Sequence, residues 1–261
     1  MVWFFFINFA VSLVRNVIVQ VDAMPLQAMT TLLFIEVKVY NTRCFMFKKK
    51  ISLFLSFVLV CSVVFSGCSN EDFGYKIPKG LKAIDLGLPS GTKWANMNLG
   101  TNKTEGLGSY FAWGEVETKS NYSWETYMHC DGNKENCFNF GESISGTGFD
   151  VAKTIWGGKW QMPTKEQADE LLRYCTATWT TSKGVDGMKF KGKNGKTIFL
   201  PVTGYRVAND TITKSQGYYV TGSQNPDSIN LVYELHFHKR KTETDGKANR
   251  GYGFIIRPVM K

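Results

Sequence analysis

The sequence contains few of the residues that usually build metal centres and nucleophilic sites. Its 261 residues include only three histidines and six cysteines, and no two pairs of them have the spacing of a zinc site. No internal repeat is visible, which excludes a solenoid, and no basic block is typical of a nucleic-acid-binding module. We therefore expect no metal, no cofactor and no nucleic-acid partner.

Apolar runs long enough to span a membrane are also missing. Residues 1–14 and 51–66 are apolar, but both fall short of the ~20 residues that a spanning helix requires. The 45 residues before Met46 have no helix caps, turns or clean hydrophobic period. We interpret residues 1–45 as upstream sequence joined by a misassigned start codon. A membrane hairpin built from the two apolar runs is the alternative.

What the sequence does contain is an export signal in residues 46–67. Three lysines at 48–50 precede an uncharged apolar run, which ends in two small residues directly before Cys68. This order of charge, apolar core and small residues is typical of a bacterial secretory signal. A cysteine in this place resembles the lipobox, although Phe65 stands where leucine is usual, and implies that Cys68 is lipid-modified. More than one acyl chain on Cys68 is enough for stable membrane anchoring.

The mature chain then runs from Cys68 to Lys261, a length that suits one domain. Residues 68–81 are polar and we interpret them as an acylated tether, with a single domain at 82–261. Because residues 1–67 hold six of the 31 basic and two of the 22 acidic residues, the mature chain keeps 25 basic and 20 acidic residues. This modest excess favours a solvated basic face over a site for acidic glycans.

Three cysteines remain besides Cys68. Cys130 and Cys137 flank a polar loop in a chain bound for an oxidising location, where a short disulfide between them and two free thiols are both compatible with the spacing. Cys175 ends a predicted helix and is most simply a small buried hydrophobe.

The clearest local elements lie in the second half of the domain. The stretch 163–174 predicts a helix, because Thr164 is a good N-cap and Gln167 completes a capping box. A shorter helix is expected over 151–156, capped by Asp150. The runs 188–191 and 196–200 alternate around Asn194-Gly195 and predict a β-hairpin. We expect further strands at 217–220, 231–237 and 253–257. The connections 116–148 and 221–230 are unusually long.

Six motifs follow one another through the domain: DLGLPSGTKWANMNLG (85–100), YFAWGE (110–115), WGGKWQMPTKEQADELL (156–172), Cys175 to Trp179, NGKTIFLPVTGYR (194–206) and GFIIRPV (253–259). Trp94, Trp113, Trp156 and Trp160 in these motifs suit a core among loops, and the arginine before the last proline suits structural hydrogen bonds.

This series resembles the Fibrobacter succinogenes major paralogous domain of Bacteroidetes lipoproteins and covers about the whole of 82–261. The resemblance implies an α+β fold of the C-type-lectin-like kind, shared with formylglycine-generating enzymes. Such a fold is loop-rich, with twisted antiparallel sheets and one or two short helices. Many relatives have Cys where this chain has Met97, which leaves Cys175 without that partner.

The sequence favours a binding or structural role over catalysis. The formylglycine-generating enzymes use a cysteine pair, but Cys130 and Cys137 lie outside the matching motifs, so an oxidoreductase-like enzyme is only the alternative. The triplet 225–227 echoes the calcium triplet of sugar-binding lectins, yet its partner motif is missing and the same residues make an ordinary turn. We expect a calcium-free surface within 217–250 to bind a glycan or protein, through residues on loops. The candidate contacts are Tyr218, Tyr219, Asn225, Tyr233 and Arg240.

Short sequence patterns also predict the cellular location of the protein and its sites of modification. Ser69 is not the aspartate that retains lipoproteins in the inner membrane, and the acidic pair at 71–72 resembles the signal for export to the outer face of the outer membrane. We therefore expect a lipid-anchored outer-membrane protein at the cell surface. Thr211 and Ser228 stand in three-residue patterns that resemble Bacteroidetes O-glycosylation sites, both in predicted loops.

Overall fold

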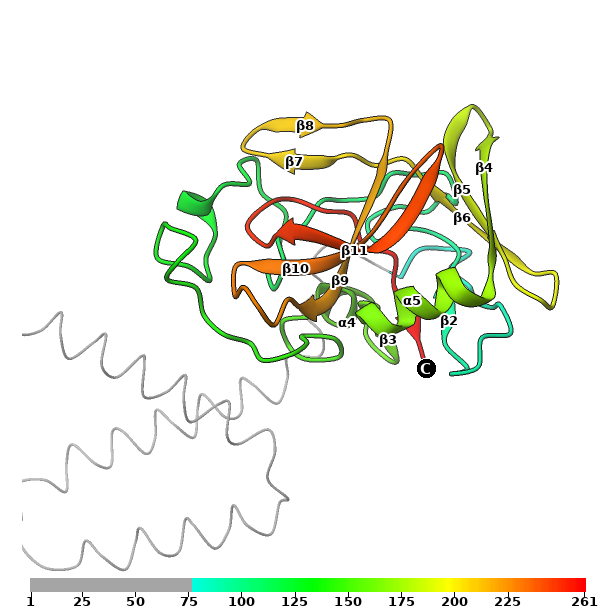
Figure 1. Cartoon of the computed structure of the whole chain (residues 1–261), viewed down its shortest axis with the longest axis horizontal. Coiled ribbons are helices and arrows are strands. Elements are labelled where there is room, and N and C mark those ends of the chain that lie inside the picture. Colours follow the sequence, from blue (N-terminus) through cyan, green and yellow to red (C-terminus); the bar gives the residue numbers. More distant parts are fainter. Residues whose placement is uncertain (1–76) are drawn as a thin grey trace, which may run out of the picture. The chain divides into compact units, whose positions relative to one another are not determined.

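Antiparallel strands and two short helices make up the part of the chain that the computed structural model describes, residues 77–261 (Figure 1). The predictions for the signal peptide, for Cys68 and for most of the tether lie outside these residues. The helical elements are η1 (Trp124–Thr126), α4 (Val151–Trp156) and α5 (Lys165–Tyr174). The strands are β1 (Ala83–Asp85), β2 (Lys93–Ala95), β3 (Trp160–Gln161), β4 (Thr176–Ser182), β5 (Val185–Lys191), β6 (Thr197–Pro201), β7 (Tyr205–Val207), β8 (Asp210–Ile212), β9 (Gly217–Gln224), β10 (Leu231–His238), β11 (Lys241–Asn249) and β12 (Val259–Met260).

Both helices begin at the caps that the sequence predicts. Asp150 accepts hydrogen bonds from the amides of Ala152 (2.9 Å) and Lys153 (3.1 Å) at the start of α4. Its other carboxylate oxygen accepts from the amides of Gly146 and Met162, so the same side chain also fixes the approach to α4 and the exit from β3. Thr164 and Gln167 form the predicted capping box of α5. The two predicted helices are confirmed.

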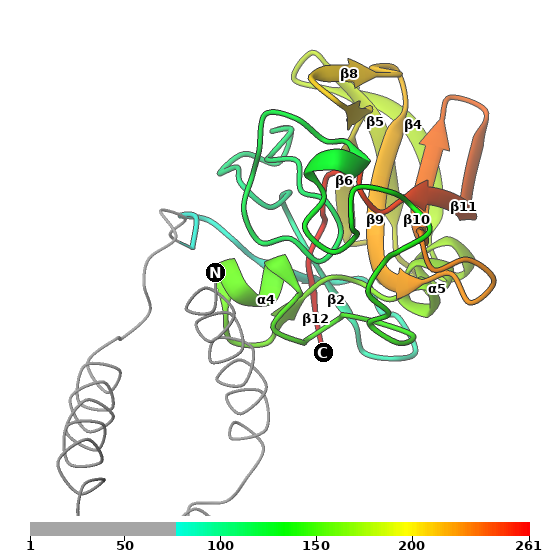
Figure 2. The same cartoon turned by 90° about the vertical axis from the view of Figure 1, so that its left-hand side faces the viewer.

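Four sheets follow from the strand pairing. Their orders are β1-β2-β12-β3, β11-β10-β9, β4-β5-β6 and β7-β8, and all pairs are antiparallel. The predicted hairpin is the pair β5–β6, which turns through Gly192 to Lys196 with Gly195 at φ +81°. The helix α5 packs against β9, β10 and β11 (Figure 2).

The sheet β11-β10-β9 contains two irregularities that redirect its side chains. Between the pairs Glu234–Gly246 and His236–Glu243, β11 has one residue more than β10. Between the pairs Val232–Gln224 and Glu234–Val220, β9 has extra residues. Such bulges bend a strand and change which face a side chain points to.

The predicted strand at 253–257 is wrong. Gly253, Phe254 and Ile255 each form a single bridge with a different segment, and the last regular strand is β12. The strands β4 and β11 were not predicted. The region 217–250 is therefore mostly sheet, not a set of loops, and Thr211 also lies in a strand, β8. Ser228 does lie in a turn, and its hydroxyl donates to Asn230 (2.6 Å).

Large aromatic side chains and two arginines, Arg250 and Arg257, are buried in the domain. Trp94, Trp113, Trp156 and Trp160 are all buried, as the motifs predict. Arg257 is fully buried and donates to Asn98 Oδ1 (2.8 Å) and to the carbonyls of Ala95 (3.0 Å) and Phe199 (2.8 Å). Its predicted structural role is confirmed. The α+β class with few helices is also confirmed.

Candidate functional site

A hollow of about 160 Å³ opens beside the sheet β11-β10-β9, and four of its eight lining residues are aromatic. We call it the aromatic hollow. It brings together residues from β7, β9, β10, β11 and the segment after β11: Tyr205, Tyr218, Glu234, Lys247, Ala248, Asn249, Tyr252 and Phe254. Five separate stretches of chain therefore contribute to one small site.

Tyr205 is the centre of the aromatic wall. Its ring lies nearly parallel to those of Tyr252 (centroids 6.2 Å apart, 12° between planes) and Phe254 (5.7 Å, 18°). The ring of Tyr218 meets it edge-on at 5.0 Å. Parallel-offset and edge-to-face arrangements are the favourable ones for aromatic pairs, so these rings support one another.

Glu234 is the one carboxyl group in the wall of the aromatic hollow, and it is only 6% exposed. Its Oε2 is buried without a hydrogen-bond partner among residues 77–261. Burial, and secondly the charge of Glu243, raise the pKa of the Glu234 carboxyl to about 7. Gly246 leaves room for this carboxyl, because a Cβ there would lie 2.8 Å from Oε1.

A stacked ring and a hydrogen bond hold Tyr218 in position. Its ring stacks on that of His236 (4.5 Å, 22°), and its hydroxyl donates to Gln216 Oε1 (2.8 Å). His236 in turn contacts the same Gln216 oxygen through Nε2 (2.7 Å) and Glu243 Oε1 through Nδ1 (3.0 Å). This network fixes the position of one wall of the hollow.

Of the five predicted contact residues, only Tyr218 lines the aromatic hollow. Tyr219 is wrong as a contact, because it is 2% exposed and its hydroxyl donates to the carbonyl of Pro201 (2.7 Å). Neighbouring residues of a strand point to opposite faces, which separates Tyr219 from Tyr218. Asn225 is also wrong: it is 1% exposed, and its Oδ1 accepts from the amide of Asp227 in the turn after β9.

The other two predicted contacts lie elsewhere. Tyr233 is half-buried, and the ammonium group of Lys165 lies 5.3 Å from its ring centre. Arg240 is exposed in the turn between β10 and β11. The sequence interpretation missed Tyr205, Glu234 and Tyr252. A charged residue inside the apolar stretch LVYELHF was the available signal for Glu234.

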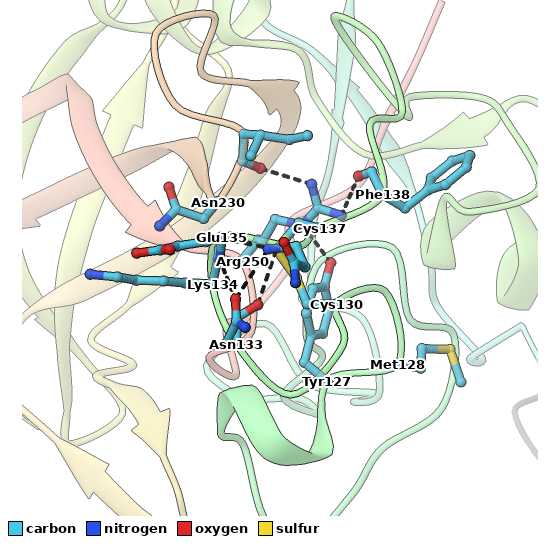
Figure 3. The surroundings of a disulfide bond; sticks show 12 residues. Tyr127, Met128, Cys130, Asn133, Lys134, Glu135, Cys137, Phe138, Asn230 and Arg250 are labelled. Atoms are coloured by element: carbon cyan, nitrogen blue, oxygen red, sulfur yellow. Dashed lines mark hydrogen bonds between the residues drawn. A yellow bond between two sulfur atoms is a disulfide. The ribbon is translucent and has the colours of Figure 1, made fainter.

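The structure contains the Cys130–Cys137 disulfide, which closes a short loop on the long connection before α4 (Figure 3). Arg250 fixes this region to the rest of the domain, although it is fully buried. It donates to the hydroxyl of Tyr127 (2.9 Å) and to the carbonyls of Ile229 (2.8 Å) and Phe138 (2.8 Å). The disulfide therefore closes a loop within the connection 116–148, and a buried guanidinium attaches the connection to the rest of the domain.

Cys175 stands apart from this pair. It is the C-cap of α5, is 9% exposed and belongs to a different hydrophobic cluster from Cys130. Burial raises the pKa of its thiol to about 11, with a smaller contribution from the charge of Glu170. A thiol with a raised pKa is a poor nucleophile.

The described part of the chain offers no group of three or more His, Cys, Asp or Glu side chains that could hold a metal ion. None of the helices within residues 77–261 is long and apolar enough to cross a membrane. In comparisons with known proteins, no family model, no curated protein and no solved structure matches this chain.

Proposed function

We propose that the chain is an exported, lipid-anchored protein of the outer membrane whose domain binds an extracellular glycan or protein at the aromatic hollow, without catalysing a reaction. The proposed location is supported by the order of charge, apolar core and Ser-Gly-Cys in residues 46–68. The C-type-lectin-like fold belongs to the same proposal. It is supported by the order of the sequence motifs and by twisted antiparallel sheets with two short helices.

The observation that carries the binding role is the unsatisfied carboxyl of Glu234. Buried polar groups nearly always have hydrogen-bond partners, and one that lacks them lowers stability. Glu234 Oε2 has none among the described residues, and Glu234 lines the hollow. A ligand that donates a hydrogen bond to this oxygen would recover the lost interaction.

The rest of the wall fits a small recognition site. Tyrosine rings supply large rigid contact surfaces at little entropic cost, and each retains a hydroxyl for hydrogen bonds. The volume of about 160 Å³ is close to the ~150 Å³ of a cavity that holds benzene, so one ring-sized group would enter. The site therefore suits the end of a larger ligand.

Binding without catalysis is the function that these residues favour. Acid–base mechanisms on glycans typically use two carboxyl groups, and Glu234 is the one carboxyl in the wall. The formylglycine-generating alternative needs a working cysteine pair. Cys130 and Cys137 are joined in a disulfide on an exposed loop, so no specific observation favours that alternative.

A glycan array and a panel of extracellular proteins, probed with the purified chain, test the proposal. We expect binding that Tyr252→Ala abolishes or weakens at least about tenfold, since a few anchors dominate a small site. Tyr233→Ala is the matched control, because Tyr233 is a half-buried tyrosine of the same sheet outside the hollow. Equal affinity of both variants would place the site elsewhere, and no binding to any probe would reject the binding role.

A further inference from the structure

We propose, on the basis of the binding function above, that the aromatic hollow receives a protonated amino group of its ligand, with Glu234 as the counterion. Aromatic faces and a carboxylate are the two kinds of group that attract an organic cation in proteins. Tyr205, Tyr218, Tyr252 and Phe254 supply the faces, and Glu234 supplies the charge.

The carboxyl of Glu234 belongs to the wall of the hollow and, among the described residues, lacks a counterion there. It is buried, and its Oε2 is without a hydrogen-bond partner within residues 77–261. A buried carboxylate is strongly disfavoured unless a cation or several donors accompany it. An ammonium group brings both a positive charge and N–H donors, whereas a neutral hydroxyl brings only a donor.

Lys247 also lines the hollow, but the strand register directs its side chain away from Glu234. Gly246 is the residue of β11 that pairs with Glu234, and Lys247 pairs with Tyr233. Successive side chains of a strand leave on opposite faces, so Lys247 leaves on the face of Tyr233. No ion pair joins Lys247 to Glu234 among residues 77–261.

The charged and titratable groups around Glu234 set the expected pH dependence. On β10 and β11 these are His236 and Glu243, which pair with each other, and Glu243 also pairs with Lys241. The other titratable side chains facing Glu234 are the tyrosines of β7, β9 and the segment after β11. On the opposite face of the sheet, Lys165 lies over Tyr233 and pairs with carboxylates of α5 and β11.

A proton and an ammonium ligand therefore compete for the same carboxyl. Burial raises the pKa of Glu234 to about 7, so lowering the pH through this value protonates the group that should hold the cation. Affinity for an amine should fall, by up to about tenfold for each pH unit below 7, because one proton is taken up when the ligand leaves. The affinity for a neutral ligand should not fall in this way, because a neutral ligand forms no ion pair with Glu234.

Calorimetric titration of the full chain in a non-ionic detergent tests the inference with matched probes. Glucosamine is compared with glucose, and butylammonium with butanol, at pH 8 and pH 5.5. The affinity for glucosamine at pH 8 is calculated for its protonated fraction, because an amino sugar loses its proton near this pH. We expect each bound amine to exceed its neutral counterpart by about tenfold or more at pH 8, as for a charge-assisted hydrogen bond, and to lose most of this preference at pH 5.5. Preference for glucosamine would indicate a glycan ligand, and preference for butylammonium a lysine side chain.

Three variants distinguish the role of Glu234 from that of its surroundings. Glu234→Gln keeps the shape, removes the charge and should abolish both the preference for amines and its pH dependence. Glu117→Gln removes an exposed carboxyl and should change neither. Tyr252→Ala should weaken amine binding at both pH values, and thermal melting of each variant verifies that it is folded. A pH-dependent preference that survives Glu234→Gln would assign the effect to His236 and overturn the inference.

The outcomes also distinguish this inference from the proposed function. Neutral probes that bind as tightly as the amines at pH 8, with loss on Tyr252→Ala, would reject the cation and keep the binding site. Failure of both amines to bind at millimolar concentration would overturn the inference, while the glycan array and protein panel decide the binding role separately.

Discussion

Removing the buried charge of Glu234 should stabilise the domain at alkaline pH and leave it nearly unchanged at acid pH. In the folded chain, burial and the charge of Glu243 raise the pKa of this carboxyl from 4.5 to about 7. The folded state therefore binds a proton more tightly than the unfolded state. Stability from this group is fully present below pH 4.5 and is lost as the pH rises through 7.

The size of the effect follows from the difference between the two pKa values. One pKa unit corresponds to about 1.4 kcal/mol, so a rise from 4.5 to about 7 costs about 3 kcal/mol of unfolding free energy once Glu234 is ionised in both states. Glu234→Gln does not ionise and escapes this loss. Relative to wild type, the variant should gain about 3 kcal/mol between pH 4.5 and pH 8.5.

Urea unfolding of a soluble version that begins at Ser69, with and without Glu234→Gln, measures this gain. All other titrating groups are shared by the two proteins, so they cancel in the difference. Glu117→Gln serves as the control for removing an exposed carboxyl and should stay within about 0.5 kcal/mol of wild type at both pH values. A Glu234→Gln difference that does not change with pH would show that the carboxyl is solvated, and the reasoning about the hollow would fail with it.

Three further perturbations have definite expected results. Cys68→Ala should abolish incorporation of a radiolabelled fatty acid and release the protein from the membrane, whereas deletion of residues 1–45 should change neither; a mature N-terminus upstream of residue 46 would contradict this. Trp113→Ala should cost about 3–5 kcal/mol in urea unfolding, as for emptying a large core site, while Phe138→Ala, at 60% exposure, should cost much less; equal losses would refute the core assignment. Arg250→Ala should cost about 2–4 kcal/mol, because it removes the hydrogen bonds to the Tyr127 hydroxyl and to the carbonyls of Ile229 and Phe138, and should speed proteolysis within 116–148; unchanged cleavage would show that Arg250 does not hold the connection.

The elements that the sequence predicts correctly are those with local determinants. The cap of α5 is formed by residues three positions apart, and the hairpin β5–β6 turns at Asn194-Gly195 between two alternating runs. Arg257 was also assigned a structural role correctly, although its partners come from distant segments. In that case the residue type is informative, because a buried arginine must donate its N–H groups to acceptors of the protein itself.

The strand β11 was missed because its sequence has neither large apolar residues nor a regular alternation. Its buried residues are Thr244 and Ala248, both small, and Gly246 between them faces Glu234. The bulge between the pairs Glu234–Gly246 and His236–Glu243 inserts one extra residue, so the period of two is broken in the middle of the strand. A pattern of this kind reads as a polar loop, which is why the contacts in 217–250 were assigned to loops.

The aromatic hollow could not be assembled from the sequence for a related reason. Its wall combines β7, β9, β10, β11 and the segment after β11, and both bulges of the sheet determine which side chains face it. Tyr218 and Tyr219 look equivalent in the sequence, yet one forms the wall and the other lies in the core. Only the register of β9 against β10 separates them.

Glu234 is a charged residue at a buried position of β10 where the packing of the fold favours an apolar side chain. The strand LVYELHFH is otherwise apolar or aromatic at its buried positions, and a leucine or methionine there would fill the same space without an unsatisfied oxygen. Its neighbours nevertheless accommodate the carboxyl, since Gly246 provides room, and Glu234 lines the hollow together with Tyr205, Tyr218 and Tyr252. Sequences tend to violate their own packing rules at functional sites. A side chain that destabilises the free domain, and that a cation would satisfy, is therefore the best-supported point of contact with a ligand.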